Sequence, residues 1–214
     1  MLNNVFLKTL WDQRRSLMWW GIGMTVISLI TMLFFPSLSD APELNELLGD
    51  EKSLMRAFVG DITDLTSPEG FLNSQLFFML IPLLFLGFAI TQGSGAIAGE
   101  EEKGTLDLLM SSPVTRRHVL VHKWAAMLTT ILVLAVATWV GLSVGAVAVD
   151  MDISLWKMAE ATLAAGFLGM AFGTLALALG AATGRRAFSI GISSVAGVTA
   201  YLINALTPAV EALE

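Results

Sequence analysis

The sequence has no cysteine, only two histidines and few charged residues. Asp, Glu, Lys and Arg make up 14% of its 214 residues, apolar residues make up 55%, and the mean hydropathy is +0.73. Without cysteine, disulfide bonds are excluded. A composition so poor in charge lies outside the range of ordinary soluble domains, and it predicts a membrane protein.

The two histidines are the first candidates for a metal site. His118 and His122 lie four positions apart and would share one face of a helix, a spacing that occurs in metal sites. They stand in a basic run that includes Arg116 and Arg117, and no carboxylate or third ligand is close in sequence. We therefore interpret them as residues of a membrane boundary and predict no metal site.

Charged residues are absent from five long windows of the sequence. Each window exceeds the roughly 20 apolar residues with which a helix crosses the hydrocarbon core of a bilayer. Because lipid offers the backbone no hydrogen bonds, each window must form a helix or a strand of a closed barrel, and the alternation of barrel strands is missing. The sequence thus predicts an all-α fold, a polytopic transmembrane helical bundle that forms one domain over residues 1–214. The windows cover residues 17–39, 70–99, 124–149, 161–184 and 187–210.

Two polar segments flank the first window. Residues 3–15 place apolar side chains, Trp11 among them, at helical spacing, which predicts an amphipathic helix in the membrane interface. A simple lead-in to the first span is the alternative. Residues 37–69 interleave Asp and Glu with leucine and predict an acidic extracytoplasmic loop. This loop could select cationic substrates, although charged loops are more often merely solvated.

The basic residues indicate the orientation. With the N-terminus in the cytoplasm, nine of the twelve Lys and Arg residues fall on the inner side, as the positive-inside pattern requires. We therefore predict a multi-pass protein of the plasma membrane with a cytoplasmic N-terminus. The nine residues are Lys8, Arg14, Arg15, Lys103, Arg116, Arg117, Lys123, Arg185 and Arg186.

The apolar windows carry no side chains for catalysis or for ion coupling. A membrane protease needs Ser with His or paired aspartates, and an ion-coupled carrier usually has an ionisable group within the membrane. Gly99 and Gly104 have the spacing of a phosphate-binding loop, but Lys103 precedes the second glycine and Thr105 follows it directly. We predict no catalytic residue, no cofactor bound by this chain and a driving force from elsewhere.

Glycine pairs four positions apart recur in the apolar windows. Close packing of helices is the ordinary explanation of such Gly-x-x-x-Gly pairs. Pro82 lies inside the second window, where a missing backbone hydrogen bond predicts a kink. The glycines expected to pack helices are Gly95, Gly99, Gly141, Gly145, Gly169 and Gly173.

The longest polar interruption on the predicted inner side covers residues 99–117. Its three consecutive glutamates precede an apolar run and would stand at the start of a short helix, whose dipole favours negative charge there. Pro113 would end that helix, and Thr115 can cap the helix that leads into the third span. The segment is too patterned for a spacer, and we predict that another protein acts on it.

This arrangement resembles the type-2 ATP-binding-cassette (ABC) exporter permeases. The resemblance lies in an amphipathic N-terminal segment and in a second span that runs into Gly-Glu-x-Glu-x-Gly-Thr-Leu-x-x-Leu and a Pro-Val-Thr-Arg turn. That family has six spans, whereas five windows are present here, so we expect that a sixth span was lost or truncated. The matching residues are Gly99, Glu100, Glu102, Gly104, Thr105, Leu106, Leu109, Pro113, Val114, Thr115 and Arg116, followed by Lys123 and Trp124 at the start of the third span.

The resemblance implies a permease subunit that is not itself an enzyme. A separate cytoplasmic ABC ATPase subunit would bind ATP and Mg, residues 99–117 would form the coupling loop that docks on it, and a second copy or a related permease would complete the pathway. The lipid membrane is the other partner, and no nucleic acid is expected. A non-transporting membrane scaffold or assembly factor is the alternative. The residues implied to bind the ATPase are Glu100, Glu102, Gly104, Thr105, Leu106, Asp107, Leu109, Met110, Pro113 and Arg116.

Overall fold

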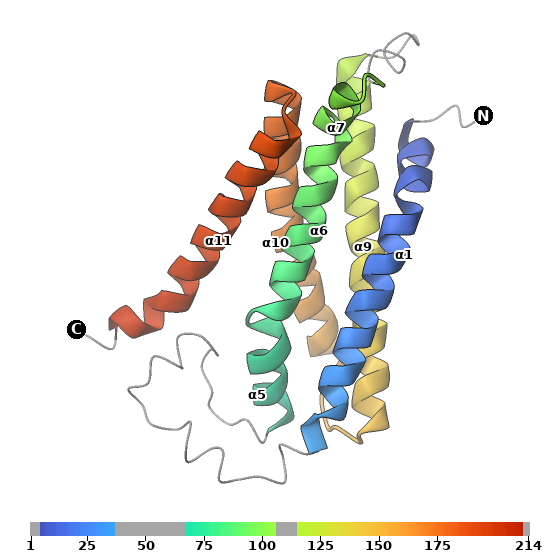
Figure 1. The fold of residues 1–214 in the computed structure, drawn as a ribbon. Coiled ribbons are helices and arrows are strands. Elements are labelled where there is room, and N and C mark those ends of the chain that lie inside the picture. Colours follow the sequence, from blue (N-terminus) through green and yellow to red (C-terminus); the bar gives the residue numbers. More distant parts are fainter. Residues whose placement is uncertain (1–4, 37–66, 106–114, 212–214) are drawn as a thin grey trace.

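The computed structural model describes residues 5–36, 67–105 and 115–211, with the side chains of 205–211 excepted. These residues form helices and no strand (Figure 1). Five helical segments are long and apolar enough to cross a membrane, which confirms the predicted all-α bundle. The elements are α1 (Val5–Leu33), α5 (Pro68–Leu72), the π-helix η1 (Asn73–Phe77), α6 (Leu80–Ala96), α7 (Ala98–Glu102), α9 (Arg116–Ala148), α10 (Leu155–Thr183) and α11 (Arg186–Glu211).

The spanning helices alternate in direction along the chain (Figure 1). The first residues of α1, α9 and α11 lie at the same end of the bundle as α7, and we call this the α7 end. From there α11 leans away from the other helices, whereas α1, α6, α9 and α10 stay side by side. Five helix ends therefore lie at the α7 end, namely the starts of α1, α9 and α11 and the last residues of α6 and α10.

A seam of backbone contact joins α6 to α10. A Cβ atom built on Gly93 would lie 2.1 Å from the carbonyl oxygen of Gly173, and one on Gly169 would lie 2.8 Å from that of Phe85. A Cβ on Gly173 would in turn lie 2.9 Å from both Cβ and O of Ala89. Only glycine allows two helix backbones to approach so closely, as in other membrane bundles.

The second close pair is α1 with α9. A Cβ on Gly141 would lie 2.9 Å from Cγ2 of Thr25, and one on Gly145 would lie 2.7 Å from Cγ of Met32. The Thr25 hydroxyl also donates a hydrogen bond to the Ala137 carbonyl at 3.2 Å. Side chains of the first span thus pack against both glycines, and these contacts hold α1 along α9.

The second span is irregular just before Pro82. The Phe78 N–H donates to the Asn73 carbonyl, five residues back, at 2.7 Å, and the chain then leaves regular helix at Met79, with φ −130° and ψ −51°. Pro82 falls in the first turn of α6, where its missing N–H costs no hydrogen bond and its ring avoids the carbonyl four residues earlier. The break thus lies about one turn ahead of the proline.

The predicted interfacial helix of residues 3–15 is not a separate element. Residues 5–15 form the first turns of α1, which continues without a break to Leu33. A helix of this length extends about 44 Å, more than the roughly 30 Å of the hydrocarbon core. The first turns of α1 therefore reach past the apolar layer, and their depth at the headgroups stays a prediction. Residues 37–66 of the acidic loop lie outside the described residues.

Candidate functional site

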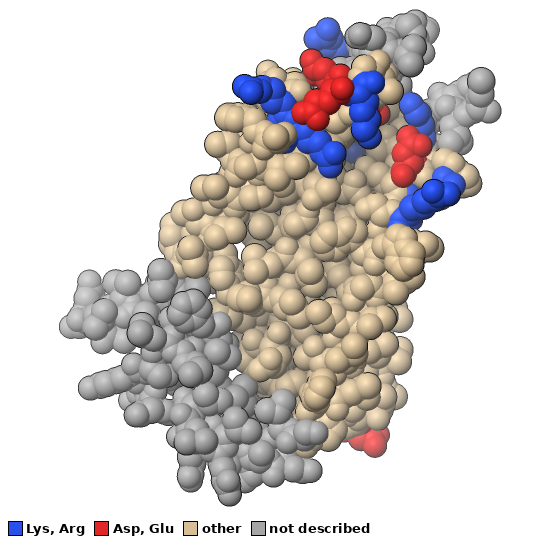
Figure 2. Space-filling model, in the orientation of Figure 1, with Lys and Arg blue, Asp and Glu red and all other residues tan. Residues whose placement is uncertain are grey.

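Charged side chains gather at the α7 end of the bundle. Figure 2 shows Lys, Arg, Asp and Glu side by side at this end and an almost uncharged surface along the rest of the described chain on the face drawn. The same end carries the connection between the second and third spans, which begins with α7. The geometry of α7 therefore decides how that connection leaves the bundle.

Glu100 of α7 forms an ion pair with Lys123 of α9. The Lys123 Nζ lies 2.7 Å from Oε1 of Glu100, and it also donates a hydrogen bond to the backbone carbonyl of Ala96. The Lys123 side chain is 3% exposed and that of Glu100 is 24% exposed. One buried ammonium group thus joins the end of α6, the short helix α7 and the first turns of α9.

Glu102 makes a second connection, to the start of α11. Its Oε1 accepts a hydrogen bond from the backbone N–H of Arg186 at 2.9 Å. The first N–H groups of a helix lack intrahelical partners and attract negative charge, so this carboxylate caps α11.

Glu101, between these two residues, lies beside the turn that joins α10 to α11. A Cβ on Gly184 would lie 2.8 Å from Oε2 of Glu101, and Gly184 has the left-handed φ of +64° that ends α10. Its N–H donates to the Gly180 carbonyl at 2.9 Å. Only glycine suits both the backbone angle and the nearby carboxylate.

The predicted packing glycines Gly95 and Gly99 face a side chain rather than another helix backbone. A Cβ on Gly95 would lie 3.8 Å from Nε of Arg186, and one on Gly99 would lie 3.7 Å from its Cδ. The two glycines therefore form a shallow face on which the Arg186 side chain lies. The spacing indicated a close contact, but it did not identify the contacting group.

The connection itself begins with a tight turn. Gly104 has a φ of +66°, its N–H donates to the Glu101 carbonyl at 2.9 Å, and the Thr105 N–H donates to the Glu100 carbonyl, also at 2.9 Å. Both residues are exposed. The carbonyls at the end of α7 are thus used in the turn, which directs the chain away from the bundle.

The predicted cap of the third span is confirmed. The Thr115 hydroxyl accepts a hydrogen bond from the His118 N–H at 3.3 Å, and Arg116 follows it as an exposed residue. His118 and His122 stack with ring centroids 3.9 Å apart, and His122 Nδ1 lies 2.8 Å from the His118 carbonyl oxygen. Within the described residues, no group of three His, Cys, Asp or Glu side chains is placed to hold a metal ion.

The residues that the family resemblance implies for ATPase binding fall into three groups. Glu102, Gly104, Thr105 and Arg116 lie on the exposed surface of the α7 end. Glu100 instead points toward Lys123, because the helix break at Ile97 turns α7 so that this carboxylate faces α9. The remaining residues, Leu106, Asp107, Leu109, Met110 and Pro113, lie outside the described residues.

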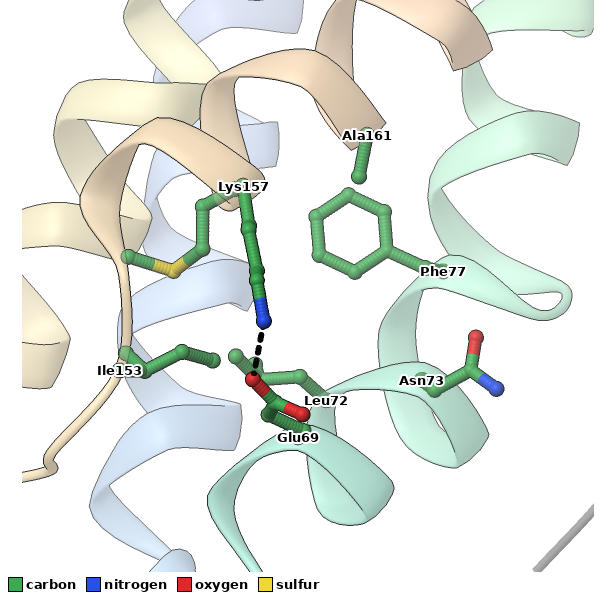
Figure 3. A pocket seen from close by; sticks show the side chains of 8 residues that line it. Glu69, Leu72, Asn73, Phe77, Ile153, Lys157 and Ala161 are labelled. Atoms are coloured by element: carbon green, nitrogen blue, oxygen red, sulfur yellow. Dashed lines mark hydrogen bonds and ion pairs between the residues drawn. The ribbon is translucent and has the colours of Figure 1, made fainter.

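A shallow groove lies at the opposite end of the bundle, between the start of the second span and α10. The Lys157 Nζ lies 2.9 Å from Oε1 of Glu69 across it (Figure 3). Both side chains are about two-thirds exposed, at 67% and 64%, so this pair contributes little to stability. The lining residues are Glu69, Leu72, Asn73, Phe77, Ile153, Lys157, Met158 and Ala161.

The fold and the site define an α-helical, multi-pass membrane protein whose charged groups surround one inter-span connection. The chain matches the family model described as "ABC-2 family transporter protein" over residues 3–210. Because this match covers nearly the whole chain, the protein belongs to that family and is a permease subunit of an ABC transporter. Membership implies an ABC ATPase as its partner. No curated protein and no solved structure matches the chain.

Proposed function

We propose that the chain is the permease subunit of an ABC exporter, and that ATP hydrolysis in a separate cytoplasmic ATPase subunit drives substrate across the membrane. The observation that carries this proposal is the α7 end, where the connection between the second and third spans starts from a helix bonded to α9 and α11, and where Lys123 of α9 also binds the end of α6. A force on that connection would reach several spans at once. ATP and Mg are bound by the partner subunit.

The distribution of charge supports a cytoplasmic location for the α7 end. Among the described residues, Lys157 is the one basic residue at the opposite end of the bundle, together with Glu69, Asp150, Asp152 and Glu160. The positive-inside pattern then puts the N-terminus and α7 in the cytoplasm of a plasma-membrane protein.

Residues 99–117 form the coupling loop in this proposal. Gly104, Thr105 and Arg116 are exposed at its two ends and available to a partner. Leu106, Leu109 and Met110 supply the apolar anchors that occupy a groove of the ATPase, and Asp107 faces basic groups beside it. Pro113 ends the docked segment. Two copies of the chain, or this chain and a related permease, complete the pathway.

Co-purification with the ATPase subunit tests this function. Replacing Leu106 and Leu109 with Asp should abolish complex formation and coupled ATPase activity, because charge would be forced into an apolar groove. The matched control, Leu106→Met with Leu109→Met, conserves volume and should keep the complex. Size-exclusion profiles in detergent verify that both variants are folded.

An unaltered complex with full transport in the aspartate variant would overturn the proposed coupling loop. Absence of any ATPase partner, with no ATP-dependent transport, would favour the alternative of a non-transporting membrane scaffold or assembly factor.

A further inference from the structure

Lys123 is exceptional in the described part of the chain, where it is the one charged side chain that is buried. Removing an ammonium group from water is costly unless a carboxylate and further hydrogen-bond acceptors surround it. Lys123 has both kinds of partner, Oε1 of Glu100 and the Ala96 carbonyl. Because losing either partner would leave a buried charge uncompensated, Lys123, Glu100 and the Ala96 carbonyl are held in fixed positions relative to one another.

The Ala96 carbonyl is available to Lys123 because the helix breaks there. In an unbroken helix it would accept the N–H of Glu100, four residues later. The N–H groups of Glu100 and Glu101 both donate instead to the Ile97 carbonyl, at 3.0 Å each. Ile97, with φ −116° and ψ −59°, separates α6 from α7. Lys123 thus replaces the hydrogen bond that the break removes.

The same ammonium group also binds the helix beyond the break. Glu100 is in α7, so its carboxylate can meet Lys123 only while α7 keeps its present direction relative to α9. Lys123 therefore holds the last carbonyl of one helix and a side chain of the next. Those two contacts together define the angle between α6 and α7.

This position matters because Lys123 lies near both ends of the inter-span connection. On one side, the connection continues from the end of α7 at Glu102, two residues after Glu100. On the other side, it ends at Thr115, the cap of α9, which lies eight residues or about two helical turns before Lys123. The ion pair between Lys123 and Glu100 thus joins the helix from which the connection starts to the helix at which it ends. A rotation of α7 would separate the two charges.

We propose that Lys123 is a positioning residue, which sets the angle between α6 and α7 and thereby the place at which the connection meets the ATPase subunit. This inference rests on the proposed function. Lys123 does not touch the ATPase or the substrate, but acts through α7. Its removal should loosen α7 and uncouple ATP hydrolysis from transport, without removing the residues that contact the ATPase.

The absence of cysteine makes a direct measurement possible. Spin labels on cysteines introduced at Lys8 and Lys103, both exposed at the α7 end, report the distance between α1 and the end of α7. The parent chain and Lys123→Arg, which keeps the charge and the donors, should give one narrow distance distribution. Lys123→Met has a side chain of similar length and no donor, and it should broaden the distribution.

The functional measurement uses unlabelled chains in the complex with the ATPase subunit. Lys123→Met should still co-purify with the ATPase and hydrolyse ATP, while transport per ATP falls by about fivefold or more. Lys123→Arg should restore this ratio. The matched control is Lys157→Met, which removes a lysine paired with a carboxylate, at 2.9 Å, at the opposite end and should change neither the distances nor the ratio.

An unchanged distance distribution and an unchanged transport-to-ATP ratio in Lys123→Met would overturn the positioning role and leave the proposed function intact. Should Lys123→Met fail to fold, Glu100→Gln decides the matter, with a broadened distribution in support and the parental distribution against. A parent chain without an ATPase partner would contradict the proposed function instead. The distances in the isolated permease would even then test whether Lys123 fixes α7.

Discussion

The Oε1 atom of Glu102 accepts a hydrogen bond from the backbone N–H of Arg186 at 2.9 Å, across 84 residues of the chain. Arg186 is the first residue of α11, so a carboxylate from the second span's extension caps the fifth span. The Arg186 side chain, in return, lies over Gly95 and Gly99 of that same segment. The contact is reciprocal, and it fixes the upper part of α11 although its far end leans away from the bundle (Figure 1).

Removing this cap should destabilise the bundle slightly. Glu102→Ala loses both the acceptor and the charge at the start of α11, and it should cost about 0.5–1 kcal/mol, as is typical of charges at helix N-termini. Apparent melting temperatures in detergent measure the effect. The control is Glu160→Ala, since this exposed glutamate has no bond to another described helix. Equal shifts in the two variants would contradict the capping role.

The seam between α6 and α10 should reject even one methyl group. Gly93→Ala would put a Cβ 2.1 Å from the Gly173 carbonyl oxygen, and the separation of backbones should cost about 1–3 kcal/mol or more. Gly191→Ala is the matched control in α11, where no heavy atom lies within 4 Å of the added Cβ. It should stabilise the helix by about 0.5–1 kcal/mol, because alanine has less backbone freedom to lose. Thermal unfolding in detergent should show a lower melting temperature for Gly93→Ala and a higher one for Gly191→Ala than for the parent chain.

Two buried serines of α11 should respond differently to the same substitution. The Ser189 hydroxyl donates to the Ala176 carbonyl of α10, whereas the Ser193 hydroxyl has no hydrogen-bond partner among the described residues. Ser189→Ala should lower stability by about 0.6 kcal/mol, the average for hydrogen bonds between membrane helices. Ser193→Ala should be neutral or stabilising, because it removes an unsatisfied polar atom. Indistinguishable losses would show that the Ser189 bond contributes nothing.

The orientation of the bundle can be measured with single cysteines. Position 103 lies at the α7 end and position 152 follows α9 at the opposite end, and both residues are exposed. A membrane-impermeant maleimide should label Asp152→Cys in intact cells and Lys103→Cys only after the membrane is permeabilised. The cysteine-free parent provides the blank. The reverse pattern would place α7 outside and contradict the proposed coupling.

The number and type of spans were predictable because the signal is local. Lipid forces each charge-free window into a helix, and no tertiary contact is needed to recognise it. The boundaries were less accurate. The third window begins only after Lys123 because that residue is charged, whereas α9 begins at Arg116, directly after its cap Thr115. A window defined by charge finds the apolar part of a helix rather than its first residue.

The interior of the candidate site was not predictable from the sequence. The sequence marks Lys123 only as one of the inner basic residues and as part of a family pattern, because its burial depends on a carbonyl 27 residues away that is freed by a break at Ile97. Likewise, Gly93 does not belong to the predicted glycine pairs, because no glycine lies four positions from it, yet it faces the Gly173 backbone of α10. Which glycine meets which helix depends on rotations and offsets that spacing along one helix does not contain.

The glycine seam has a mechanical consequence for the second and fourth spans. Where backbone meets backbone, as at Gly93 and Gly173, no side-chain rotamer can change to absorb a small displacement. A displacement of the end of α6 therefore shifts α10 as a whole helix, and the two helices move together as one rigid body. Helix α11 is bonded to α7 at Arg186 and leans away from the bundle beyond that residue. It is therefore the spanning helix that can change its tilt without moving this rigid pair.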